Sequence, residues 1–124
     1  MDVGSLVGGS SEVIGREATL EQAADALIRL GVGSLAVVDN RSLAGIITER
    51  DIVRAVSEDA DPATEVVGDW MSEAPDTIDP GVDVEEAAAW LLEVGYRHLP
   101  VMEDDELVGI VSMRDLLWAI TSEE

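Results

Sequence analysis

The chain has 124 residues, no cysteine and a formal net charge of −20, with 27 acidic side chains against seven basic ones, all of them arginine. This length fits one compact domain. The absence of cysteine excludes disulfides, thiol catalysis and thiolate metal sites, and the acidic excess argues against a nucleic-acid surface. No apolar run reaches the roughly 20 residues of a membrane helix, and no signal-peptide pattern is present. We therefore expect a cytoplasmic protein, adapted either to a salty interior or to a GC-rich genome.

The first half of the chain predicts a βαββα unit. Thr19 and Gln22 form a capping box at the start of its first helix, and Gly31 ends that helix. Thr48 caps the second helix, and the acidic stretch 57–65 is typical of a linker. The expected elements, in chain order, are a strand at 13–14, a helix at 20–30, strands at 34–39 and 43–48 around a turn at 40–42, and a helix from 49 to about 56.

The second half predicts the same unit again. Asp83 and Glu86 start its first helix, Gly95 ends it, and Ser112 caps its second helix. The expected elements are a strand at 77–78, a helix at 84–94, strands at 98–103 and 107–112 around a turn at 104–106, and a helix from 113 to about 121.

The two halves are copies of one another. When the chain is shifted by 64 residues, 16 of the 54 pairs from 3/67 to 56/120 are identical without a gap, whereas chance matching would give about four. The duplication predicts an α+β protein with one repeat at 1–60 and a second at 61–124.

The second repeat resembles the CBS (cystathionine-β-synthase) domain family. Its segment "GYRHLPVMEDDELVGIVSMRDLL" has the order of that family's signature, and "VGDWMSEAPDTI" resembles the usual lead into a repeat. The first repeat, "GVGSLAVVDNRSLAGIITERDIV", is similar but less complete. It has Ala36 in place of Pro100, and Gly33 and Ser34 in place of Arg97 and His98.

This resemblance implies a pair of CBS repeats packed through their sheets around a pseudo-twofold axis, a so-called Bateman module. It further implies two related clefts that hold adenosine-type ligands such as AMP, ADP, ATP, NAD or S-adenosylmethionine, with no cofactor required. Pairs in this family commonly form a homodimer, a disc of four CBS units, and regulate another protein. The partner, the ligand and the number of occupied clefts stay open.

Two Ser/Thr-x-x-Asp segments carry the ribose-binding hypothesis. Thr48 with Asp51, and Ser112 with Asp115, place a hydroxyl and a carboxylate on one helix start. A carboxylate accepts two hydrogen bonds from the vicinal hydroxyls of a ribose, and the family uses these positions in that way. The alternative is that both segments only cap their helices.

The phosphate and the adenine have candidate residues as well. Arg97, His98, Arg114 and Arg50 lie beside the proposed clefts, where a phosphate would gain charge-assisted bonds and helix N–H groups. The alternative is that the arginines pair with neighbouring carboxylates. An apolar slot for adenine, or else ordinary sheet core, is expected at Val13, Ile14, Ala36, Thr77, Ile78 and Pro100.

No catalytic set and no metal site is predicted. The acidic runs 58–61 and 103–106 are typical of solvated turns, and the single histidine is not a convincing general base. Trp90 and Trp118 are the favoured dimer-surface residues. We therefore expect a non-enzymatic regulatory module that senses an adenosine nucleotide; the alternative is a dimerisation or adaptor module without a ligand, and an enzyme is the least favoured.

Overall fold

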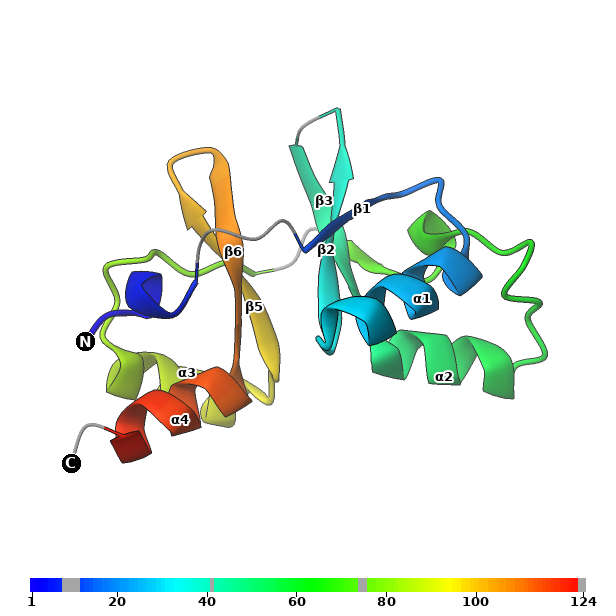
Figure 1. Ribbon diagram of the computed structural model, residues 1–124. Helices are drawn as coiled ribbons and strands as arrows, with labels where there is room; N and C mark the ends of the chain where they lie inside the picture. Colours follow the sequence, from blue (N-terminus) through cyan, green and yellow to red (C-terminus); the bar gives the residue numbers. More distant parts are fainter. Residues whose placement is uncertain (8–11, 41, 74–75, 123–124) are drawn as a thin grey trace. The chain divides into compact units, whose positions relative to one another are not determined.

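The computed structural model describes residues 1–7, 12–40, 42–73 and 76–122, and the chain divides into two compact units (Figure 1). Unit 1 combines Met1–Ser11 with Asp76–Glu124, and unit 2 is Glu12–Pro75. Arg41, in the middle of one predicted turn, lies outside the described residues. The mixed α+β class and the two repeats are confirmed.

Unit 2 contains a four-stranded sheet in the order β1-β2-β3-β4. Strand β1 is parallel to β2, whereas the β2–β3 and β3–β4 pairs are antiparallel. The short 3-10 helix η2 and the strand β4 were not predicted from the sequence. The elements are β1 (Val13–Gly15), α1 (Leu20–Leu30), β2 (Ser34–Asp39), β3 (Ser42–Thr48), α2 (Glu49–Ser57), η2 (Val67–Asp69) and β4 (Ser72–Glu73).

Local signals determine where α1 begins and ends. Thr19 Oγ1 accepts a hydrogen bond from the Gln22 backbone N–H at 3.1 Å, and the Gln22 side chain accepts one from the Thr19 N–H at 2.9 Å. At the other end, Gly31 has φ +68°, a left-handed conformation that a residue with a Cβ adopts only at a cost. The predicted capping box and C-terminal glycine are confirmed.

The core of unit 2 lies between the sheet and its two helices. Helices α1 and α2 lie side by side against the strands (Figure 1), and both contribute aliphatic side chains to one cluster. Burial of this kind contributes about 0.8 kcal/mol per CH₂ group. The buried members are Leu20, Ala23, Ala26, Leu27, Leu35, Val37, Ile47, Ala55 and Val67.

Unit 1 repeats this arrangement around a two-stranded β5–β6 sheet. The predicted strand at 77–78 is reduced to one parallel bridge between Ile78 and Val101. The elements are η1 (Val3–Leu6), α3 (Val84–Val94), β5 (His98–Glu103), β6 (Glu106–Ser112) and α4 (Met113–Ser122). The buried core is Val3, Ile78, Val84, Ala87, Ala88, Leu91, Leu99, Val101, Val111, Leu116 and Ala119.

The two hairpins have the same register at a distance of 64 residues. Val37 is opposite Gly45 and Val101 is opposite Gly109, and each register shifts directly after that pair. The turn residue Asp104 has φ +54°, a conformation that Asp and Asn tolerate better than most other residues. Both second strands begin one residue earlier than predicted, at Ser42 and Glu106.

Each unit is completed by the segment that leads into the other repeat. The N–H of Val3 donates to Val82 O at 2.8 Å in unit 1, and the N–H of Val67 donates to Ala18 O at 2.8 Å in unit 2. These bonds are equivalent under the shift of 64 residues, and both valines are fully buried. The compact units therefore do not share the bounds of the sequence repeats 1–60 and 61–124.

Candidate functional site

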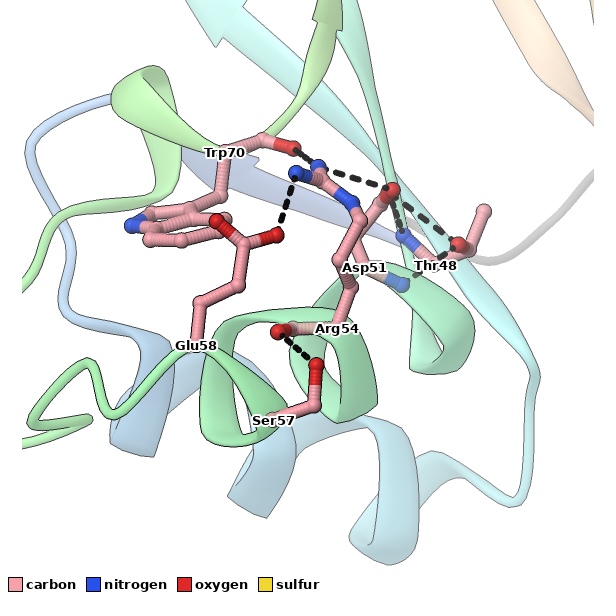
Figure 2. A network of polar contacts seen from close by, with 6 residues as sticks. All are labelled: Thr48, Asp51, Arg54, Ser57, Glu58 and Trp70. Carbon is pink, nitrogen blue, oxygen red and sulfur yellow. Dashed lines mark hydrogen bonds and ion pairs between the residues drawn. The ribbon is translucent and has the colours of Figure 1, made fainter.

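In unit 2, the Ser/Thr-x-x-Asp segment forms a complete capping box at the start of α2 (Figure 2). Asp51 Oδ2 accepts hydrogen bonds from the Thr48 N–H at 2.9 Å and from the Thr48 hydroxyl at 3.0 Å. In return, Thr48 Oγ1 accepts the Asp51 N–H at 3.2 Å. The carboxylate is thus held by its own helix start, as the capping interpretation expects.

Unit 1 has the same box with fewer bonds. Asp115 Oδ2 accepts the Ser112 N–H at 3.0 Å, and Ser112 Oγ accepts the Asp115 N–H at 3.0 Å. Both residues are half-buried. Within the described part of the chain, Asp115 Oδ1 has no hydrogen-bond or ion-pair partner. The capping role is present in both units, and a ribose-binding role remains a prediction at both.

Arg54 is a site residue that the sequence reasoning missed. Its Nη2 lies 3.7 Å from Asp51 Oδ1 and donates to the Trp70 backbone oxygen at 3.2 Å. Its guanidinium carbon lies 5.0 Å from the centroid of the Trp70 ring, and Nη1 lies 3.8 Å from Glu58 Oε2 (Figure 2). The i,i+3 spacing from Asp51 was the available signal.

The described arginines fall into two groups. Arg16, Arg29 and Arg54 form ion pairs with carboxylates. The other three have exposed guanidinium groups that make no hydrogen bond or ion pair with the described residues, so the carboxylate-pairing alternative does not apply to them there. They are Arg50, Arg97 and Arg114.

In unit 1, the predicted phosphate and ribose residues lie at the same end of the β5–β6 hairpin. His98 is directly opposite Ser112 in the sheet. The Met113 N–H donates to the Arg97 backbone oxygen at 2.8 Å, so the last turn before β5 is bonded to the start of α4. Arg97, His98 and the Ser112-x-x-Asp115 segment therefore form one local group.

The predicted adenine residues differ in how much surface they present. Val13 is 40% exposed and lies opposite Ala36, which is fully buried; Ile14 is half-buried. In unit 1, Thr77 is exposed, and the N–H of the buried Ile78 donates to the oxygen of the buried Pro100 at 3.0 Å. Contact with adenine stays a prediction for all six, and the buried three are also sheet core.

Tyr96 lies beside this part of unit 1. Its hydroxyl donates a hydrogen bond to Asp76, and this bond, together with the negative charge of Asp76, raises the pKa of the Tyr96 phenol. The Tyr96 and Trp90 rings meet edge to face, with centroids 6.1 Å apart. Trp90 thus packs within its own unit, whereas Trp118 is 62% exposed. Of the two predicted dimer-surface tryptophans, only Trp118 is largely exposed to solvent.

Among the described residues, no three His, Asp or Glu side chains converge as a metal ion would require. Every helix in the same part of the chain is too short or too polar for a membrane crossing.

A duplicated α+β unit, each copy ending in a helix capped by Ser/Thr-x-x-Asp, defines a tandem-repeat protein class. The CBS domain family model matches residues 10–58 and 67–122. The chain belongs to the CBS domain family. A CBS-domain protein from Burkholderia ambifaria has the same fold, with a TM-score of 0.93 and 26% identity over 100% of this chain and 96% of that one.

Two other relatives extend the comparison. CBSX2 of Arabidopsis thaliana, solved in complex with AMP, has a TM-score of 0.80 and 26% identity over 97% of this chain and 96% of that one. An uncharacterized protein of Methanopyrus kandleri is 38% identical over 90 residues, which cover 70% of this chain and 46% of that protein. The chain spans about half the length of the curated relatives it matches.

Proposed function

We propose that this protein is a non-enzymatic regulatory module that binds an adenosine-type nucleotide such as AMP, ADP, ATP, NAD or S-adenosylmethionine. The observation that carries the proposal is the pattern of unpaired cations. In a chain with a net charge of −20, arginines next to abundant carboxylates would be expected to pair. Yet the side chains of Arg97, whose backbone oxygen is bonded to the start of α4, and of Arg114, next to Asp115 in the sequence, make no hydrogen bond or ion pair with the described residues.

The chemistry of a nucleotide matches this group in unit 1. Vicinal ribose hydroxyls can donate to the open oxygen of Asp115, and the exposed guanidinium groups can bind phosphate through charge-assisted hydrogen bonds. The complex of the relative CBSX2 with AMP supports the same ligand class. We propose unit 1 as the better-equipped half, because Gly33 and Ser34 replace Arg97 and His98 in the other repeat.

Calorimetric titration with each of the five ligands at high salt tests this proposal. Asp115→Asn keeps an oxygen that can accept the Ser112 N–H and so preserves the cap, but it removes the carboxylate charge. Hydrogen bonds to charged groups contribute about 1.5–3 kcal/mol, so we expect affinity to fall roughly 10- to 100-fold while the unfolding temperature changes little. Arg97→Met should weaken AMP binding more than adenosine binding.

Arg29→Met is the matched control, because Arg29 pairs with Asp25 at 3.7 Å on α1 and is not a candidate site residue. It should leave affinity unchanged. Binding that is absent for all five ligands, or that is unaffected by Asp115→Asn and Arg97→Met, would overturn the nucleotide-binding proposal.

A second candidate function, dimerisation, is favoured by exposed apolar residues on the helices. Of the ten large exposed hydrophobic residues in the described part of the chain, eight lie on α1 to α4. Three pairs among them are equivalent under the 64-residue shift, so the duplicated unit retains the same apolar surface. The pairs are Ile28 with Leu92, Leu30 with Val94, and Val53 with Leu117.

We propose that this helical surface binds a second copy of the chain. Such exposed apolar side chains are typical of association surfaces, and an isologous pairing would use the same residues of both copies. Sedimentation velocity should give a dimer for the natural chain and a shift toward monomer for Trp118→Ser. Val13→Ser, an exposed apolar change on a strand, should leave the dimer intact. A monomeric natural chain would refute dimerisation without touching nucleotide binding.

A further inference from the structure

The two Ser/Thr-x-x-Asp carboxylates have different numbers of open positions. A carboxylate offers about four lone-pair sites. Asp51 uses two on the Thr48 N–H and hydroxyl, and Arg54 Nη2 faces a third on Oδ1 at 3.7 Å. Among the described residues, Asp115 accepts one hydrogen bond, from the Ser112 N–H. Two ribose hydroxyls therefore fit on Asp115 as it stands, whereas on Asp51 they compete with Arg54.

The position of Arg54 is built into unit 2. The side chain is held from three further sides, by the Trp70 backbone oxygen, by the Trp70 ring and by Glu58. The ring is itself anchored, because Trp70 Nε1 donates to Glu65 Oε1 at 3.0 Å. These contacts tie α2 to the segment around η2 and keep the guanidinium next to the carboxylate (Figure 2).

Unit 1 has no counterpart to this arrangement. The residues 64 positions away from Arg54, Trp70 and Glu58 are Trp118, Leu6 and Ser122. None of them carries a positive charge that could face Asp115. The difference in positive charge beside the two carboxylates therefore originates at position 54. The capping boxes add a second difference, because the Thr48 hydroxyl donates to Asp51, whereas Asp115 accepts only from the Ser112 N–H among the described residues.

We propose that Arg54 is a specificity-determining residue that acts as an internal competitor for Asp51 and lowers the affinity of the first ribose position below that of the second. The inference rests on the proposed nucleotide binding and adds which of the two positions is filled first. A ligand must displace only the Arg54–Asp51 ion pair, since the contacts of Arg54 with Trp70 and Glu58 can persist.

The expected effect follows from the exposure of that pair. The Arg54 side chain is 51% exposed and the Asp51 side chain 16%, so solvent screens much of the attraction. Ion pairs of this kind change an equilibrium by about two- to five-fold. Removing the guanidinium should tighten binding at Asp51 by that factor.

The experiment isolates the Asp51 position with Asp115→Asn and uses AMP as the probe in calorimetric titration. The double variant Asp115→Asn with Arg54→Met should bind AMP about two- to five-fold more tightly than Asp115→Asn alone. Methionine keeps the aliphatic part of the side chain over the Trp70 ring, and thermal unfolding checks that the fold is kept. The matched control, Arg29→Met in the same background, should bind like Asp115→Asn.

A second measurement weakens the ion pair between Arg54 and Asp51 with salt rather than by substitution. Adenosine has no charge, so salt acts on its binding mainly through the protein's own ion pair. Raising KCl from about 0.1 M to about 1 M shortens the Debye length from about 10 Å to about 3 Å. Adenosine affinity of Asp115→Asn should rise with salt, and that of the double variant should rise less.

The outcomes separate the two proposals. Binding by the natural chain with equal AMP affinity in Asp115→Asn and in the double variant would overturn the Arg54 proposal and leave the nucleotide-binding proposal standing. The same holds if the salt response of adenosine binding is identical in the two variants. If neither the natural chain nor Arg54→Met binds AMP or adenosine, both proposals fail.

Discussion

Because the segment before each repeat packs with the other repeat, an arrangement that we call the exchange of leading segments, Val3 should stabilise unit 1, the unit built mainly from the second repeat. Val3 is fully buried in the core of unit 1, and its N–H is bonded to Val82. Val3→Ala removes two methyl groups. Their transfer free energy, about 1.6 kcal/mol, and the cavity left behind suggest a loss of roughly 2–3 kcal/mol.

Amide hydrogen exchange measured residue by residue tests where this loss falls. Because each unit has its own core, local stability can differ between them. A loss of about 2–3 kcal/mol lowers protection roughly 30- to 150-fold. We expect that decrease at the buried β5 and β6 amides, such as Leu99 and Val111, and a much smaller one at Leu35 and Ile47 of unit 2.

Val67→Ala is the reciprocal control. Val67 is equally buried but belongs to the core of unit 2, so it should reverse the pattern. If Val3→Ala lowered amide protection more in unit 2 than in unit 1, residues 1–7 would stabilise their own repeat, and the exchange of leading segments would be refuted. Equal losses of protection in both units for both variants would show that the two units unfold together as one cooperative structure. The prediction of unit-specific stability would then be wrong.

The remaining predictions concern single side chains. The protein contains one tyrosine, and absorbance titration should give it a midpoint above the ordinary value of about 10, because the neutral Tyr96 phenol donates to Asp76. The stability from this bond is present below about pH 10 and is lost as the pH rises through the pKa of the folded state. The variant Asp76→Asn should bring the midpoint back toward about 10. Gly95→Ala should lower the free energy of unfolding in urea by roughly 1–2 kcal/mol, because Gly95 has φ +89°; an unchanged value would refute the left-handed cap.

Much of the fold was predictable because its signals are local. The capping box at Thr19 and the glycines after α1 and α3 define helix ends within a few residues, and the predicted bounds of both agree with the structure. Strands were predicted at both 13–14 and 77–78, yet in the second segment only Ile78 pairs, through one bridge. Repeat symmetry predicts which residues are equivalent but not how far the pairing extends.

The long-range features were not predictable from local pattern. The partner of Val3 is some 80 residues away, and nothing in the segment 1–7 indicates whether it packs with its own repeat or with the other. Trp90 and Trp118 lie on the two helices of the second repeat, and sequence alone did not separate the partly buried ring from the exposed one. Both outcomes depend on tertiary packing, which hydrophobic periodicity does not encode.

The same distinction applies to the candidate site. Ser/Thr-x-x-Asp indicated two equivalent carboxylates, and the capping bonds at Asp51 and Asp115 are indeed alike in their main-chain part. Two features separate them: the hydroxyl bond from Thr48 to Asp51, and a side chain three residues further on, which is Arg54 in one unit and Trp118 in the other. A duplicated motif therefore need not mean a duplicated affinity, because the neighbour that competes for the carboxylate lies outside the motif.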